Sequence, residues 1–343
     1  MTRAFRQIPE TDPSQLLRLR DGIYAADLLI AAVSWLDLFS WLAGNPSDLD
    51  RVCSSLGIAH RPADVMLTLF VAMGLLRSDK GRFCLSTRAR EHLVKGAPWD
   101  LRPYYDSLKE RPICKDMLQV LRTGKPANWS SKGDGIDWAK AMSSESFAQG
   151  FTSAMDSRGA YLAPMMAREL RCPGYRSLLD IGGGSGIYAC AVLAANRHMK
   201  ATILEKPPVD EVTRWSIRQK GMQDRITVLG RDMFDELPHG FDIHLFSNVL
   251  HDWDEKAIGL LFKNSFAALS PGGMVGVHDA HLNQKKTGPL PVAEYSVLLM
   301  YSTEGRCYSV AEMRDVLRES GFGRTQFVHT AAHRSLITAR KPG

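Results

Sequence analysis

The feature that most constrains the fold is a run of glycines between an apolar strand and a helix. Residues 178–192 read LLDIGGGSGIYACAV, and the acid Asp180 comes just before the glycines. Glycine lets the backbone turn sharply and approach a ligand closely. From residue 176 onward, short apolar runs alternate with helical patterns. This alternation predicts a mostly parallel α/β sheet covered on both faces, with ligands at the carboxyl ends of its strands.

The glycine loop does not match two common phosphate-binding patterns. The nicotinamide fingerprint G-x-G-x-x-G, started at Gly182, would need glycine in place of Ile187, and no Gly-Lys-Ser/Thr follows. Glu205 ends the next strand, ATILE, and can accept hydrogen bonds from ribose hydroxyls. Asp232, in GRDMF, can accept from an amino group such as adenine's, and Met233 can pack on a base. Either acid alone could be a solvated loop residue, but the ordered set predicts a nucleoside cofactor.

The stretch SNVLHDWDE, residues 247–255, places a histidine beside several acids. Taken alone, His251 could be a catalytic base, a metal ligand or a polar residue in a turn. The sequence WDEKAIGLLFKN reads as the start of a helix, in which Asp254 suits the N-cap and Glu255 the first turn. Helix capping explains these two acids better than ligation, so we predict no metal site.

The N-terminal part of the chain predicts a winged helix. Residues 16–44 carry an apolar stripe at helical spacing, Ser47 is expected to cap the next helix, and residues 60–76 form a further helix. Residues 75–86 then read as a hairpin around Asp79-Lys80-Gly81. A helix that reads DNA needs exposed polar side chains, whereas residues 65–76 are mostly apolar. We therefore expect packing within the domain and against a second subunit, and no nucleic-acid partner.

Composition sets the remaining expectations. The six cysteines show no C-x-x-C pair, which favours reduced thiols in the cytoplasm over zinc or disulfides. The first residues lack the apolar core of a secretory signal, and no run of about 20 apolar residues predicts a membrane span. The net charge of +6 is compatible with anionic small molecules as well as with nucleic acid, so it does not decide between them.

Four motifs together resemble those of a known family. LLDIGGGSG, GRDMF, NVLHDWDE and LSPGGMVGV resemble the motifs of class I S-adenosylmethionine-dependent methyltransferases. More narrowly, the chain resembles the small-molecule O-methyltransferases, which include plant caffeic-acid and flavonoid enzymes, hydroxyindole O-methyltransferases and bacterial polyketide-tailoring enzymes. The resemblance covers nearly the whole chain, since that family carries an N-terminal winged-helix-like dimerisation domain.

The resemblance implies an organisation and an activity. Residues 1–96 would be a mainly α winged-helix-like dimerisation domain, residues 97–170 a helical connector, and residues 171–343 a Rossmann-like catalytic domain with a mostly parallel seven-stranded sheet. The expected protein is a cytoplasmic homodimer that methylates a hydroxyl of a small aromatic compound, phenolic or polyketide-like. The acceptor would bind between the catalytic domain and helices from residues 97–170.

The resemblance also implies site residues. The histidine of HDW is the family's general base, here His251, and Asp279 matches the acid that flanks it. FAQGFTSAM resembles the helix that faces the acceptor, which suggests Phe151 and Met155. Met300 is a further candidate for the acceptor pocket, although core packing explains it equally well. The implied S-adenosyl-L-methionine site comprises Asp180, Gly182, Gly184, Gly186, Glu205, Asp232, Met233 and Ser247.

Two positions depart from the plant pattern. Plant members have a lysine where this chain has Ser247, and a second glutamate beside the histidine where it has Cys307. Loss of that carboxylate leaves other chemistry open on the same fold: C- or N-methylation, or a cofactor-assisted reaction without methyl transfer, such as decarboxylation. A winged-helix DNA-binding regulator that senses the cofactor is the alternative from another class.

Overall fold

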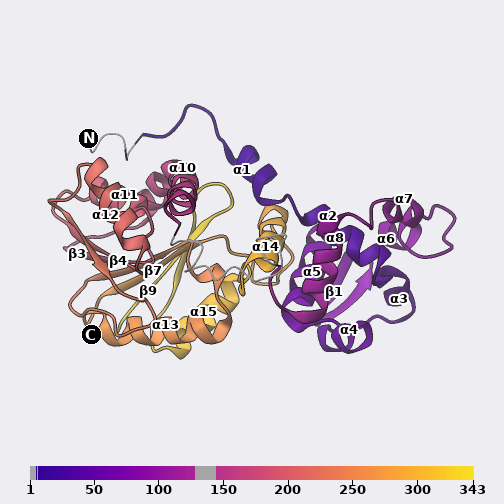
Figure 1. Cartoon of the computed structure of the whole chain (residues 1–343). Coiled ribbons are helices and arrows are strands. Elements are labelled where there is room, and N and C mark those ends of the chain that lie inside the picture. The colour runs from indigo at the N-terminus through magenta and orange to yellow at the C-terminus, as the bar shows by residue number, and fades with distance from the viewer. Residues whose placement is uncertain (1–4, 6, 128–143) are drawn as a thin grey trace. The chain divides into compact units, whose positions relative to one another are not determined.

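The computed structural model describes residue 5, residues 7–127 and residues 144–343. The chain divides into two compact units, each made from separate stretches of sequence (Figure 1). The sheet unit comprises residues 1–17, 136–281 and 310–343, and the helical unit comprises residues 18–135 and 282–309. The three-part division at residues 96 and 170 stays a prediction, because backbone contacts do not define which parts fold independently.

The helical unit has the predicted order of helices followed by a hairpin. Strands β1 (Leu76–Asp79) and β2 (Arg82–Leu85) pair antiparallel, and the two turn residues Lys80 and Gly81 both have positive φ. This turn geometry matches the right-handed twist of the strands. The helices of this unit are α2 (Ala25–Ser34), α3 (Leu38–Gly44), α4 (Leu49–Leu56), α5 (His60–Ala72), α6 (Thr87–His92), α7 (Arg102–Asp106), α8 (Pro112–Thr123) and α14 (Leu290–Ser302), and α1 (Ser14–Asp21) spans the boundary between the units.

The structure corrects two details of the N-terminal prediction. The apolar stripe over residues 16–44 is divided among three helices rather than carried by one. The N-cap of α4 is Asp48, whose side chain accepts a hydrogen bond from the Arg51 backbone at 2.9 Å, so the assignment to Ser47 is wrong. Ser47 instead forms a backbone bridge with Phe83 of the hairpin, a contact that local sequence does not reveal.

Helix α5 is packed in the core, as its apolar sequence predicts. Its buried side chains include Val65, Met66, Leu67, Leu69 and Phe70. These side chains stabilise the helical unit and leave few positions on the helix that could contact base edges.

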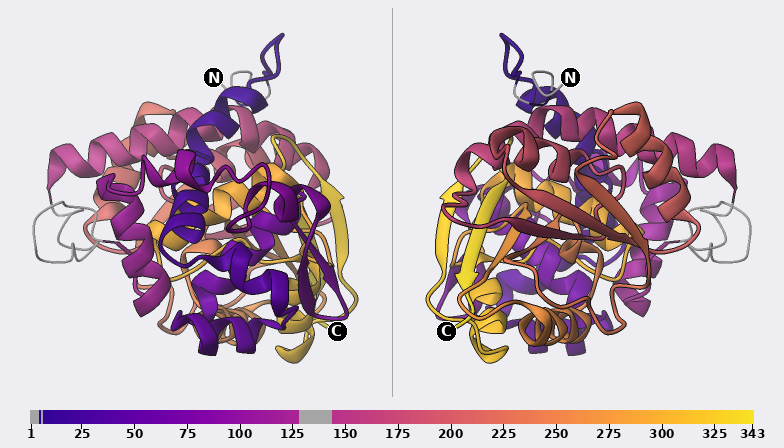
Figure 2. Two further views of the ribbon diagram at one scale, coloured as in Figure 1. Left: turned by 90° about the vertical axis from the view of Figure 1, so that its right-hand side faces the viewer. Right: turned by 90° about the vertical axis from the view of Figure 1, so that its left-hand side faces the viewer.

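The sheet unit contains the predicted mostly parallel seven-stranded sheet, in the order β5-β4-β3-β6-β7-β9-β8. Its strands are β3 (Ser177–Ile181), β4 (Lys200–Glu205), β5 (Ile226–Gly230), β6 (Ile243–Ser247), β7 (Met274–Asp279), β8 (Gln326–His329) and β9 (Ser335–Arg340). Strands β3 to β7 are parallel, and the C-terminal hairpin of β8 and β9 adds antiparallel to β7. Figure 2 shows this hairpin in yellow at one edge of the sheet.

Helices cover both faces of the sheet, which explains why its central strands are mostly apolar. Helices α10 (Glu145–Glu169), α11 (Ile187–Ala195) and α12 (Val209–Gln219) lie on one face (Figure 1). Helices α13 (Glu255–Ala268) and α15 (Val310–Glu319) lie on the other. The residues of β6 and β7 are all buried between these layers.

No single helix in the described ranges is long and apolar enough to cross a membrane. One bent pair, residues 14–34 with 38–44, passes that test on length and composition alone.

Candidate active site

The glycine loop joins β3 to α11 at the carboxyl edge of the sheet. Gly182, Gly184 and Gly186 have φ of +66°, +53° and +76°, values that favour glycine. A Cβ on Gly183 would lie 2.7 Å from Asp180 Oδ2, so that position also has no room for a side chain. The loop therefore exposes backbone rather than side chains to anything bound beside it.

Asp180 is a fully buried acid beneath this loop. Within the described part of the chain, neither carboxylate oxygen has a hydrogen-bond partner. The pKa of Asp180 is raised to about 7, mainly by burial and to a smaller extent by the nearby charge of Glu205. An unpartnered buried carboxyl group is costly, which fits a loop built to receive a ligand that supplies hydrogen-bond donors.

Glu205, at the end of β4, contacts the same loop. Its Oε2 accepts a hydrogen bond from the Gly184 backbone at 2.9 Å, and its Oε1 accepts from the Lys206 backbone at 3.0 Å. Burial raises the pKa of Glu205 despite these bonds. The structure thus brings together two parts of the predicted cofactor site that lie on different strands.

Asp232 and Met233 follow the next strand, β5. Asp232 Oδ1 accepts from the Phe234 backbone at 3.0 Å, and Oδ2 pairs with Lys206 Nζ at 3.1 Å. Met233 Sδ lies 3.7 Å from where a Cβ of Gly182 would stand, so Met233 borders the glycine loop. Lys206 was not predicted, and its only sequence signal is that it follows Glu205.

At the end of β6 the chain turns to present His251. Ser247 is the last strand residue, and its buried Oγ has no partner among the residues that the structure describes. Asn248 takes a positive φ of +54° and donates from Nδ2 to Tyr188 Oη at 2.8 Å. A 3₁₀ turn, η2 (Leu250–Asp252), then carries the histidine.

His251 is 5% exposed and is paired with Asp279 at the end of β7. The Nδ1 atom lies 2.5 Å from Asp279 Oδ1, and Nε2 lies 3.7 Å from Asp252 Oδ1. Burial alone would lower the pKa of His251, but the charges of Asp279 and Asp252 raise it above its ordinary value. Burial opposes ionisation of Asp279 as well, yet His251 holds the pKa of that carboxyl well below its usual range.

Two other histidines near this pair are neutral. Burial lowers the pKa of His278 to about 3 and that of His281 to about 4. His278 Nε2 contacts Thr330 Oγ1 at 3.0 Å, and His281 Nδ1 contacts Ser335 Oγ at 2.8 Å. Among the residues that the structure describes, His251 is the one of these three with a carboxylate directly hydrogen-bonded to its ring.

Asp254 caps α13, as predicted. Its Oδ1 accepts a hydrogen bond from the Ala257 backbone at 2.8 Å, and Glu255 opens the first turn of the helix. Among the described residues, no group of three histidine, cysteine or acidic side chains could hold a metal ion.

The predicted acceptor residues are divided between the units. Phe151 and Met155 lie on α10 in the sheet unit, although the position of the Phe151 side chain is outside the described set. Arg158, which sequence reasoning missed, donates from Nη2 to Met155 Sδ at 3.3 Å and lowers the pKa of His251 through its charge. Met300 is fully buried on α14 of the helical unit, so it is not brought together with His251 within one unit.

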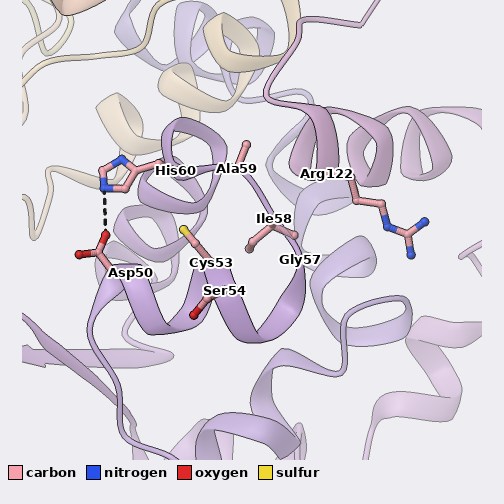
Figure 3. Close-up of a pocket in the computed structure, with 8 residues that line it drawn as sticks. All are labelled: Asp50, Cys53, Ser54, Gly57, Ile58, Ala59, His60 and Arg122. Carbon is pink, nitrogen blue, oxygen red and sulfur yellow. Dashed lines mark ion pairs between the residues drawn. The ribbon is translucent and has the colours of Figure 1, made fainter.

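A separate surface hollow lies in the helical unit, between α4, the start of α5 and the end of α8 (Figure 3). Its lining includes the ion pair of His60 with Asp50, together with Cys53, Ser54 and Arg122. Most of these side chains are exposed, and none belongs to the predicted site. The hollow is therefore not the candidate active site.

The sheet order, with an antiparallel hairpin at one edge, is the architecture of class I methyltransferases, and the glycine loop stands at the expected strand end. A family model described as an O-methyltransferase domain matches residues 115–323, more than half of the chain. The chain belongs to this family and is an O-methyltransferase that depends on S-adenosylmethionine.

Two similar proteins are named for aromatic substrates. One is 3-hydroxy-5-methyl-1-naphthoate 3-O-methyltransferase of Streptomyces sahachiroi, 31% identical over 93% of this chain and 92% of its own length. Another is L-tyrosine C(3)-methyltransferase of Streptomyces lavendulae, 30% identical over 89% of this chain and 86% of its own.

Similar solved structures include an O-methyltransferase family 2 protein of Planctomyces limnophilus in complex with apigenin. It is 32% identical, covers 98% of both chains, and gives a TM-score of 0.89. Human N-acetylserotonin methyltransferase in complex with S-adenosylmethionine has a TM-score of 0.62 at 22% identity, over 97% of this chain and 99% of its own, which supports the fold alone.

Proposed function

We propose that the protein methylates a hydroxyl group of a small aromatic natural product, phenolic or polyketide-like, with His251 as the general base. The observation that carries the proposal is the contact of 2.5 Å between His251 Nδ1 and Asp279 Oδ1 at the carboxyl edge of the sheet. The names of two similar proteins point to the same substrate class: one methylates a hydroxynaphthoate, and the other is bound to apigenin, a hydroxylated flavone.

The cofactor would be held by the glycine loop and the two strand-end acids. The unpartnered carboxyl group of Asp180 and the tight backbone of the glycine loop fit a ligand that approaches closely and donates hydrogen bonds. We assign the ribose to Glu205 and the adenine to Asp232 and Met233, with Ser247 as a further contact. When bound, S-adenosylmethionine supplies an electrophilic methyl group on its sulfonium.

The histidine pair suits removal of a phenolic proton. An ionised Asp279 can only accept hydrogen bonds, so it holds the proton on Nδ1 and leaves the ring lone pair on Nε2. A phenol has a pKa near 10 and an ordinary histidine near 6.5, a gap of about 3.5 units. The raised pKa of His251 narrows this gap, and its Nε2 needs to take the proton only as the new bond forms.

Replacement of the base tests the proposal. The wild type is first incubated with S-adenosylmethionine and a library of phenols, and a product heavier by a methyl group is sought by mass spectrometry. We expect His251→Ala to lower kcat on that acceptor by about 10²–10⁴-fold. S-adenosylhomocysteine should still bind the variant in a calorimeter, because the cofactor residues are unchanged. A near-normal kcat for the variant would disprove the general-base role.

Methylation of carbon or nitrogen is the alternative chemistry, and a relative named as a C(3)-methyltransferase of tyrosine supports it. Cys307 also keeps a reaction without methyl transfer open, because the second carboxylate of the plant pattern is missing. NMR of the product separates these outcomes: an O-methyl proton signal supports the main proposal, and a C-methyl or N-methyl signal supports the alternative.

We further propose a homodimer formed through the N-terminal domain, residues 1–96. Large apolar side chains are exposed on the helical unit, among them Leu19, Ile23 and Trp35, which supports a surface covered by a second copy.

All six cysteines are free thiols, which supports the predicted reducing, cytoplasmic location.

A further inference from the structure

Helix α10 lies very close to α11, the helix that begins where the glycine loop ends (Figure 1). A Cβ on Gly159 would lie 2.5 Å from Cγ2 of Ile187, closer than real Cβ atoms come to other heavy atoms. Ile187 is the first residue of α11, and Gly159 is buried. The absence of a side chain at Gly159 therefore brings α10 within reach of the loop.

Asp156, nearly one turn earlier on α10, bridges the helix to the loop. Its Oδ1 accepts a hydrogen bond from the hydroxyl of Ser185, which lies between Gly184 and Gly186 and is 4% exposed. Its Oδ2 accepts from Lys220 Nζ at 2.8 Å. The side chains of Lys220 and Asp156 are 14% and 33% exposed, so solvent screens this ion pair less than one at the open surface.

The same contacts continue through α12. Lys220 Nζ also donates to Ser216 Oγ, which in turn donates to the Ser185 carbonyl at 2.9 Å. Thr213 Oγ1 donates to the Gly184 carbonyl at 2.6 Å. Side chains of α12 thus bind the carbonyl groups of the loop, whereas Asp156 of α10 binds the side chain of Ser185.

Asp156 is close in sequence to two residues of α10 that bear on the proposed acceptor site and on the base. Met155, a predicted acceptor residue, comes immediately before it, and Arg158 comes two positions after it. The charge of Arg158 acts on both His251 and Asp252, so α10 lies within electrostatic reach of the base. A movement of α10 would therefore change both the acceptor side of the site and the field at the imidazole.

We propose that Asp156 is a positioning residue that couples the cofactor loop to α10, so that cofactor binding orders the helix for the acceptor. The inference rests on the proposed function, because it takes the loop as the cofactor site and α10 as the acceptor helix. The coupling is reciprocal: an acceptor that orders α10 strengthens cofactor binding by the same factor by which the cofactor strengthens acceptor binding.

Hydrogen–deuterium exchange of the full chain with S-adenosylhomocysteine tests this coupling without a known acceptor. In the wild type, we expect the ligand to slow exchange in the loop and, by about tenfold, in residues 152–169 of α10. Asp156→Ala removes both the acceptor of the Ser185 hydroxyl and the partner of Lys220. Ser185→Ala removes the hydrogen bond from the loop side. In both variants the loop should remain protected, while the response of α10 falls below about twofold.

Tyr161→Phe is the matched control, because Tyr161 Oη ties α10 to Asp12 at 3.0 Å without touching the glycine loop. In Tyr161→Phe, S-adenosylhomocysteine should slow exchange in α10 as much as in the wild type. The coupling proposal fails if α10 of the wild type does not respond, if both loop-side variants keep the full response, or if Tyr161→Phe loses it equally. Absence of S-adenosylhomocysteine binding to the wild type would instead overturn the proposed cofactor site, and the coupling with it.

Discussion

At the scale of single residues, the contact between His251 and Asp279 sets the pH at which the base can act. Burial lowers the pKa of His251, Asp279 and Asp252 raise it, and Arg158 lowers it again, with a net rise above the ordinary value. The imidazole accepts a proton only when it is neutral. The rate should therefore increase as the pH rises through this raised pKa.

Asp279→Asn removes the charge that contributes most to raising this pKa. We expect the acidic limb of a plot of log kcat/KM against pH to move to lower pH, since burial then dominates. The plateau should fall by about 10²-fold, the low end of the contribution of a positioned base, because the amide no longer holds the imidazole as a charged acceptor does. An unmoved limb would contradict the assignment.

The stability of the same variant gives an independent check on the pair. The Asp279 contribution to folding is present above the ordinary carboxyl pKa of about 3.9 and is lost as the pH falls toward its lowered folded value. The His251 contribution is present below about 6.5 and is lost as the pH rises through its raised folded value. The difference in unfolding free energy between wild type and Asp279→Asn should thus be largest between about pH 4 and 6.5.

At the scale of elements, α10 carries two helical glycines with opposite surroundings. A Cβ on Gly159 would meet Ile187 Cγ2 at 2.5 Å, whereas a Cβ on Gly150 would meet nothing within 4 Å. We expect Gly159→Ala to lower the free energy of unfolding by about 1–3 kcal/mol, because α10 must move away from α11. Gly150→Ala should raise it by about 0.5–1 kcal/mol, the usual preference for alanine in a helix.

Chemical denaturation of both variants separates packing from helix propensity. The two substitutions are chemically identical and lie on the same helix, so propensity alone would give them the same sign. A stabilising Gly159→Ala would contradict the close packing of α10 on α11, in which a Cβ on Gly159 would lie 2.5 Å from Ile187 Cγ2.

At the scale of the whole molecule, the proposed dimer can be tested through the exposed apolar side chains within residues 1–96. Leu19 is 65% exposed and Ile23 is 60% exposed. We expect the wild type to sediment as a dimer, and the double variant Leu19→Glu/Ile23→Glu to dissociate toward the monomer at micromolar concentration, because buried unpaired carboxylates are costly.

Leu260→Glu is the control for this experiment. Leu260 is also exposed, at 46%, but it lies on α13 of the sheet unit. The Leu260→Glu variant should remain dimeric. A wild type that sediments as a monomer at all concentrations would refute the dimer proposal.

The amino-acid sequence by itself determined the elements whose signals are local. The strand, glycine loop and helix around Gly182, the hairpin turn at Lys80-Gly81 and the cap at Asp254 each depend on backbone preferences within a few residues. The prediction at Ser47 was wrong by one position, because its backbone pairs with Phe83, 36 residues away in the chain.

Only the tertiary structure decided which side chains meet. His251 and Asp279 are 28 residues apart in sequence, and Asp156 and Lys220 are 64 apart, yet the parallel strands and the helices on one face of the sheet bring each pair into contact. Burial, and with it the pKa of His251 and of Asp180, likewise arises only when distant elements pack together. Local sequence sets backbone conformation, whereas distances, burial and charge at the site depend on contacts between elements that no short segment contains.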